Sequence, residues 1–155
     1  MIRFGPAGNS QAFYDAGYSS SLDVPKFLSE KGLNAYEYQC GRGVRVKQEF
    51  CRQLAVEADK HNVFLSLHSP YFINLATPDP KVMDSSLNHL RKSLEAASAM
   101  EAKRIVVHPG SVGKGNTRSD ALKRAEVLLG RVLEEIMPDY PEIFLCLETM
   151  GKVNQ

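Results

Sequence analysis

The sequence lacks long apolar runs and a cysteine framework. No apolar run approaches the roughly 20 residues that a membrane-spanning helix requires. The chain begins directly with a strand-like segment, so we expect neither a signal peptide nor a membrane partner. Its three cysteines, Cys40, Cys51 and Cys146, are odd in number and widely spaced, which does not favour disulfides. We therefore expect a reduced, cytoplasmic setting.

Glycine-rich nucleotide motifs and a charge excess are also missing. No G-x-G-x-x-G and no G-x-x-x-x-G-K follows a predicted strand, which weakens the nucleotide-binding classes. The net charge of +1 neither indicates nor excludes nucleic acid, because acidic helices can balance a basic surface. With 155 residues and no low-complexity segment or linker, the chain is predicted to be one domain.

Short apolar segments alternate with segments of helical period. The segments predicted as strands are 2–4, 35–38, 63–68, 104–108 and 143–148. The last three show no polar alternation, which is typical of strands buried on both faces. Between them, apolar residues recur every three or four positions, as in Leu87, Leu90, Leu94 and Ala97. This order predicts an α/β fold with a parallel sheet.

Local signals mark the helix ends. Asp79 followed by Pro80 predicts an N-cap and a first helical turn, and Thr117 with Asp120 resembles a capping box. Gly32 is typical of the position that ends a helix. Both a doubly wound sheet and a (β/α)8 barrel fit the pattern. A barrel needs about 250 residues, so the chain is either a complete five-stranded sheet or part of a barrel.

Three consecutive predicted strands end on a metal-ligand residue: His68, His108 and Glu148. The carboxyl ends of parallel strands meet at one edge of the sheet, where active sites of such folds lie. Two imidazoles and a carboxylate are the ligands of many catalytic zinc sites. A single histidine at a strand end is more often a hydrogen-bonded core residue. Core packing, however, gives no reason for three consecutive strands to end on a metal-ligand residue. We therefore predict a metal site.

The loops after these strands carry further candidates. Tyr71 and Phe72 are adjacent, so in extended chain one ring can join the core while the other is free to stack. The glycines of the second loop, Gly110, Gly113 and Gly115, allow the close approach of an anion, although a flexible surface loop is equally compatible. We assign no role to His89, which falls on the polar side of a helical stripe.

Taken together, these motifs resemble the endonuclease IV family of apurinic/apyrimidinic endonucleases, within the xylose-isomerase-like TIM barrels. The matching stretches are "HSPYFINLATPD" (68–79), "VVHPGS" (106–111) and "LETMGK" (147–152), with a weaker "FGPAGN" (4–9). The resemblance implies a partial (β/α)8 barrel of about the first five strands, with residues 1–155 forming the N-terminal part of one domain.

The resemblance also implies an activity: a zinc-dependent DNA-repair endonuclease that cleaves the phosphodiester 5′ to abasic sites in duplex DNA with up to three zinc ions. His68 and His108 match the ligands of one zinc, and Glu148 matches the catalytic carboxylate that bridges it to a second. Tyr71 and Phe72 match rim residues that enter the duplex at the lesion. In the loop after the predicted strand 35–38, Arg42 matches a DNA-contacting basic residue or is simply solvated.

Departures from the family pattern leave alternatives open. Pro6 and Ala7 stand where a histidine-containing stretch is often found, and the later ligands have no counterpart in this sequence. We therefore expect the 155-residue chain itself to be inactive. The alternatives are a sugar isomerase or epimerase of the same superfamily, with one divalent cation, and a non-catalytic metal-binding half-barrel. Uncovered sheet edges predict a dimer or a swapped assembly.

Overall fold

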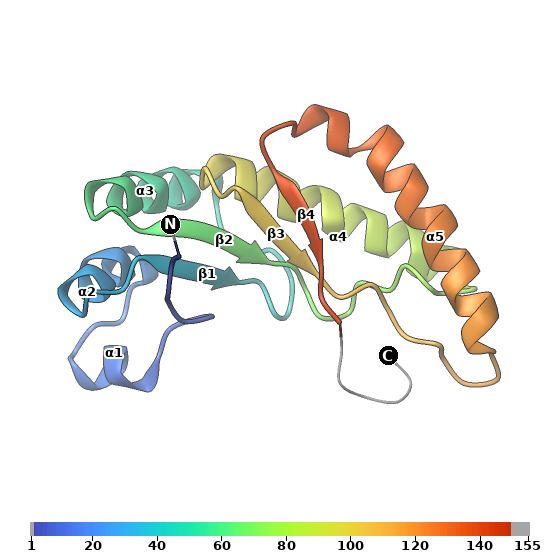
Figure 1. The fold of residues 1–155 in the computed structure, drawn as a ribbon, viewed down its shortest axis with the longest axis horizontal. Helices are drawn as coiled ribbons and strands as arrows, with labels where there is room; N and C mark the ends of the chain where they lie inside the picture. Colours follow the sequence, from blue (N-terminus) through green and yellow to red (C-terminus); the bar gives the residue numbers. More distant parts are fainter. Residues whose placement is uncertain (1, 150–155) are drawn as a thin grey trace.

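Four parallel strands form a single sheet in chain order. The computed structural model describes residues 2–149. In it β1 (Ala35–Gln39), β2 (Phe64–His68), β3 (Arg104–Val107) and β4 (Phe144–Leu147) lie side by side (Figure 1). Each strand is joined to the next through a helix, which is the repeat of an α/β barrel. The predicted α/β fold is confirmed as a parallel sheet that makes up part of a barrel.

The predicted apolar stripe of Leu87, Leu90, Leu94 and Ala97 lies on one of five helices. They are α1 (Gln11–Asp15), α2 (Val24–Glu30), α3 (Gln48–Lys60), α4 (Pro80–Ala99) and α5 (Arg118–Glu135), with short 3-10 turns η1 (Ser21–Asp23) and η2 (Met137–Asp139). The caps are also as predicted. The side chain of Asp79 accepts from the amide of Lys81 at 2.8 Å, and that of Thr117 accepts from the amide of Asp120 at 3.1 Å. Gly32 follows α2 with a φ of 71°.

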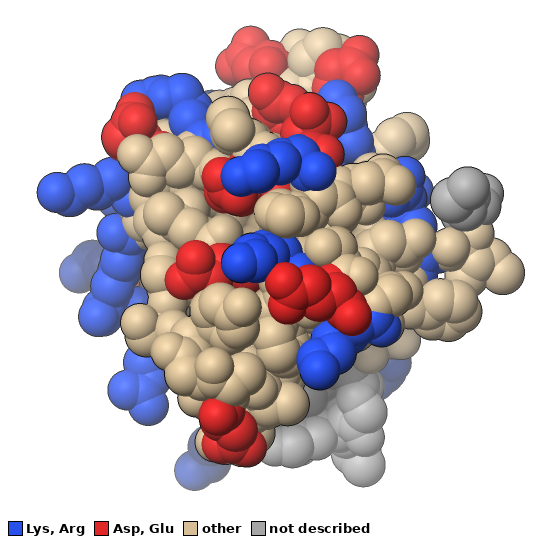
Figure 2. Space-filling view, turned by 90° about the vertical axis from the view of Figure 1, so that its left-hand side faces the viewer, with Lys and Arg blue, Asp and Glu red and all other residues tan. Residues whose placement is uncertain are grey.

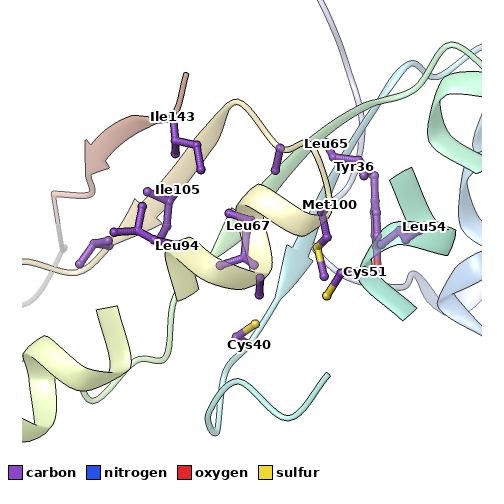
Figure 3. Packing of buried hydrophobic residues seen from close by; sticks show 14 of the residues in the cluster. Tyr36, Cys40, Cys51, Leu54, Leu65, Leu67, Leu94, Met100, Ile105 and Ile143 are labelled. Carbon is purple, nitrogen blue, oxygen red and sulfur yellow. The ribbon is translucent and has the colours of Figure 1, made fainter. Parts of the chain in front are cut away.

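The core lies between the sheet and the helices α3 and α4. Strand side chains Leu65, Leu67 and Ile105 are at most 5% exposed and belong to one cluster with Leu54 of α3 and Leu94 of α4 (Figure 3). Burying a leucine or isoleucine side chain contributes about 1.5–3 kcal/mol. This cluster therefore fixes the positions of the strands, and with them the strand ends that carry the candidate ligands.

The predicted strand at residues 2–4 is wrong. The segment does run beside β1: the carbonyl of Phe4 accepts from the amide of Ala35 at 3.1 Å, and that of Pro6 accepts from Glu37 at 3.1 Å. A single bridge joins Ala7 to Glu37. Proline has no N–H to donate, so Pro6 interrupts a regular ladder. Gly5 passes so close to β1 that a Cβ there would overlap the carbonyl of Ala35.

The last three predicted strands are expected to be buried on both faces, and within residues 2–149 this expectation is also wrong. On the sheet face away from the helices, Phe144 is 67% exposed and Arg104 is exposed. The Arg104 guanidinium lies 5.2 Å from the ring centre of Phe64 and 5.9 Å from that of Phe144. Arg3 lies over the same Phe64 ring at 5.1 Å. This exposed layer of guanidinium and aromatic groups lies near the amino ends of the strands.

Charges of both signs are mixed on one side of the molecule. On the side of the molecule at the left of Figure 1, Lys and Arg side chains alternate with Asp and Glu side chains (Figure 2). A hollow of about 510 Å³ between α2 and α3 is lined by both signs, including Lys26, Arg52 and Glu57. None of its lining residues is a candidate ligand. Within the part of the chain that the structure describes, no helix is long and apolar enough to span a membrane.

Candidate metal centre

The three predicted ligands lie together at the carboxyl edge of the sheet. His68 is the last residue of β2, while His108 and Glu148 directly follow β3 and β4. The Nε2 atom of His68 is 3.1 Å from Oε2 of Glu148, and the Nε2 atom of His108 is 3.3 Å from the same oxygen. One candidate ligand atom from each residue lies within 4.8 Å of the others. The strand register therefore brings all three side chains together, as expected.

Two of the three ligand separations are close to those around a tetrahedral zinc ion. Two ligands that are each about 2.1 Å from such an ion lie about 3.4 Å apart. The distances of 3.1 and 3.3 Å from the two imidazoles to the carboxylate are close to that separation. His68 and His108 are 6% and 12% exposed at their side chains, whereas Glu148 is 46% exposed. The cluster is thus enclosed on the histidine side and open to solvent on the carboxylate side.

A hydrogen bond to the backbone orients the ring of His68. Its Nδ1 atom lies 2.8 Å from the backbone carbonyl of Ser69. A carbonyl only accepts, so Nδ1 carries a hydrogen, and Nε2, which faces Glu148, is the ring atom available to a metal ion. The Nδ1 atom of His108 is buried and has no partner among the described residues. The ring of His68 is therefore the more firmly oriented of the two.

Tyr71 covers the two imidazoles. Its ring centre is 5.1 Å from that of His68 and 5.3 Å from that of His108, and Tyr71 is still 50% exposed. The hydroxyl donates to Oε1 of Gln39 at 3.3 Å, and the backbone amide donates to the carbonyl of Gly41 at 3.3 Å. Tyr71 is therefore both an accessible aromatic residue and a packing neighbour of the candidate ligands.

Phe72 lies beside Tyr71 but contacts neither candidate ligand ring. It is 49% exposed, and its ring meets that of His89 edge to face at a centroid distance of 4.6 Å. His89, for which no role is predicted from the sequence, comes from α4. Burial lowers the pKa of His89, and Lys92 adds to this effect, so His89 is neutral near pH 7. The neutral ring of His89 thus packs against the ring of Phe72.

Arg42 lies in the loop between β1 and α3. It is exposed, and its guanidinium makes no hydrogen bond or ion pair within residues 2–149. With Arg45 it lines a hollow of about 220 Å³. The neighbouring Gly41 packs against Tyr71, where an added Cβ would come within 3.0 Å of the ring. The loop therefore adjoins the aromatic cover of the site, while a contact of Arg42 with DNA stays a prediction.

Sequence reasoning missed two residues at this edge. Gln39 ends β1 and pairs in register with His68, so the strand-end argument would have found it had it been applied to β1. Asn74 bridges the loops that follow β2 and β3 through hydrogen bonds with Ala76 and Ser111. No local sequence pattern indicates this bridge, because its two partners come from different loops.

The parallel sheet of βα repeats is that of an α/β barrel, and its carboxyl edge carries two histidines and a glutamate that could hold a metal ion. A family model described as xylose isomerase-like TIM barrel matches residues 25–155. The chain belongs to this family.

Curated relatives and solved structures resemble the chain over part of their length. A "Probable endonuclease 4" of Mycoplasma pneumoniae is 36% identical over 101 residues, which are 63% of this chain and 34% of the relative. Another, of Bacillus licheniformis, is 28% identical over 147 residues, covering 88% and 46%. A D-tagatose 3-epimerase-like protein superposes with a TM-score of 0.70 at 25% identity, covering 82% of this chain and 48% of that one. The chain thus spans between a third and a half of the length of these proteins.

Proposed function

We propose that this chain carries the amino-terminal half of the active site of a zinc-dependent endonuclease that cleaves DNA 5′ to abasic sites. The observation that carries the proposal is the convergence of His68, His108 and Glu148 beneath the accessible aromatic ring of Tyr71. Relatives called probable endonuclease 4 support the assignment to this branch of the family.

Each residue has a definite role in this proposal. His68 and His108 bind one zinc ion through Nε2, and Glu148 binds it through a carboxylate oxygen that also faces solvent. When bound, zinc supplies Lewis-acid stabilisation of a phosphate group and lowers the pKa of water. As the catalytic carboxylate, Glu148 would hold the zinc ion at the open side of the cluster, where a phosphodiester can approach.

The aromatic residues provide the preference for a lesion. Tyr71 and Phe72 are each about half exposed beside the cluster, so both rings are accessible to a duplex. An abasic nucleotide costs less to extrude than a paired one, because little stacking is lost. Rings that occupy the vacated space replace part of that stacking. Arg42, exposed in the adjoining loop, pairs with a backbone phosphate.

The chain covers only part of the related proteins, which affects the activity that we expect of it. We infer that residues 1–155 are the N-terminal part of a single barrel domain, since they cover about half of the related proteins. The remaining ligands of a three-zinc site, and incision itself, then depend on strands that this chain does not contain. A cytoplasmic location stays a prediction, which the three free cysteines support.

A sugar epimerase is the second candidate, favoured by the resemblance to the D-tagatose 3-epimerase-like protein at 25% identity. Both functions would use the same metal ligands, so metal binding alone does not separate them. An epimerase would bind a free ketose and would show no preference between duplexes.

The deciding experiment measures binding of the zinc-loaded chain to two duplexes of one sequence, one intact and one with a single abasic-site analogue. Both titrations use the same stated salt concentration, because phosphate contacts make affinity salt-dependent. We expect tighter binding of the abasic duplex, and His68→Ala is expected to reduce both the zinc content and this preference. Equal affinity for the two duplexes would end the repair proposal, and specific binding of a ketose would favour the epimerase.

A further inference from the structure

Asn74 locks together the two loops that carry the candidate site. Its carboxamide oxygen accepts from the backbone amide of Ala76 at 3.0 Å and from that of Ser111 at 3.2 Å. The amide of Leu75 also donates to the carbonyl of Pro109 at 2.9 Å. Gly110 has a φ of 129°, and an added Cβ would overlap the Asn74 oxygen. The glycine that sequence reasoning linked to an anion thus makes room for the Asn74 side chain.

These hydrogen bonds also determine which end of the Asn74 side chain is the nitrogen. Two backbone N–H groups point at the same atom, so that atom must be the oxygen. The NH2 group therefore faces elsewhere, and it makes no hydrogen bond within residues 2–149. Asn74 lines a hollow of about 150 Å³ together with Tyr71, His108 and Ser111.

The choice of asparagine is informative about what the hollow binds. If the bridge between the loops were the only requirement, an aspartate would accept the same two N–H groups more strongly, because charge strengthens such hydrogen bonds. An aspartate would also place a negative charge beside His108. A neutral side chain with a spare donor is suited to an anionic or oxygen-rich ligand. The hollow is smaller than the roughly 300 Å³ or more of drug-sized pockets, so it suits a group of a few atoms.

We infer that the NH2 group of Asn74 is a substrate-binding donor, which hydrogen-bonds a nonbridging oxygen of a phosphodiester held at the His68, His108 and Glu148 cluster. The inference rests on the proposed function and adds a specificity residue to it. Asn74 then acts twice: its oxygen holds the loops in place, and its nitrogen contacts the ligand.

Asn74→Asp separates the two roles. The substitution keeps the acceptor for Ala76 and Ser111, removes the donor and introduces a negative charge. Asn88→Asp, at an exposed position on α4, is the matched control for the added charge. The ligand probe is dimethyl phosphate, titrated into the zinc-loaded chain. The readouts are zinc content, the thermal midpoint and the NMR signal of the Asn74 side-chain amide, identified by its absence from the Asn74→Asp spectrum.

We expect dimethyl phosphate to shift the Asn74 amide signal of the parent chain. Asn74→Asp should keep its zinc and fold while its phosphate affinity falls about tenfold or more, as for the loss of a hydrogen bond to a charged group. Asn88→Asp should bind like the parent. The parent spectrum tests the inference even where a variant is unstable. An Asn74 amide signal that stays in place while the zinc-bound site fills with phosphate would show that the residue only bridges the loops.

Two further outcomes distinguish this inference from the proposed function. If dimethyl phosphate shifts the Asn74 signal but intact and abasic duplexes bind equally, the donor role holds and the repair function fails. If D-fructose shifts the signal while dimethyl phosphate does not, the phosphodiester assignment is overturned together with the repair function.

Discussion

At the residue scale, the structure separates two neighbours that the sequence treats as a pair. Tyr71 packs against both candidate ligand rings, whereas Phe72 contacts His89 on α4. We predict that Phe72→Ala weakens binding of an abasic duplex about tenfold, on the scale of roughly 1–3 kcal/mol for an aromatic–base contact, and leaves zinc content unchanged. Duplex titration and metal analysis measure the two effects.

Tyr71→Ala is the informative comparison for that prediction. Because its ring touches His68 and His108, its removal should lower zinc affinity as well as DNA binding. Loss of a hydrogen-bonded outer partner of a metal ligand typically costs 10- to 100-fold in affinity or activity, and we take this range as the upper limit for a ring that only packs against the ligands. If Tyr71→Ala retained full zinc affinity while Phe72→Ala lost it, our division of roles between the two rings would be wrong.

His89 gives a pH-dependent prediction. Burial first, and Lys92 second, hold the pKa of His89 below its usual value of about 6.5. The folded state therefore disfavours protonation, so the stability that depends on a neutral His89 is present above pH 6.5 and is lost as the pH falls below it. Thermal midpoints measured between pH 8 and pH 5 should fall more steeply for the parent than for His89→Gln. Parallel curves would contradict this assignment, since the other three histidines are common to both proteins.

At the element scale, α4 is held at its start by Asp79, whose carboxylate accepts from the amide of Lys81. We predict that Asp79→Ala lowers the free energy of unfolding by about 1 kcal/mol, as for other N-caps. In a chain of this size that corresponds to about 2–4 °C in the thermal midpoint. Asp84→Ala, at an exposed position of the same helix, is the control and should change the midpoint little. Equal shifts for both variants would show that the cap contributes nothing.

The elements that the sequence predicts well are those set by local rules. The apolar period of α4, its Asp79 cap and the glycine after α2 follow from short-range geometry, and all three are present. The segment at residues 2–4 has the composition of a strand, but Pro6 interrupts the pairing that composition alone cannot test. Asn74 escaped notice for a related reason, because Ser111 reaches it only after the chain has folded.

At the scale of the whole molecule, the sheet face away from the helices is the surface at which we expect association. Phe144 is 67% exposed there, close to the Arg104 guanidinium, and aromatic and arginine side chains are enriched in protein interfaces. We predict that the isolated chain self-associates, with a weight-average mass above 17.2 kDa that rises with concentration. Sedimentation equilibrium measures this mass, and Phe144→Lys should lower it. Strictly monomeric behaviour at every concentration would contradict the predicted dimer or swapped assembly.

The last prediction links metal content to activity. Within residues 2–149 the structure brings together one group of metal-ligand residues, His68, His108 and Glu148, so we expect one zinc ion per chain rather than three. Phosphodiester cleavage by a multi-metal site needs several ions to stabilise the attacking and leaving oxygens together. The purified, mass-verified chain should therefore bind an abasic duplex without incising it. Elemental analysis gives the stoichiometry, and a gel assay of labelled duplex detects incision.

Glu148→Gln should keep the fold and lose the zinc, because the neutral amide is a weaker ligand than the carboxylate that both imidazoles face. Metal-dependent incision by the chain would mean that an assembled oligomer supplies the missing ligands, and that incision should then disappear in Phe144→Lys.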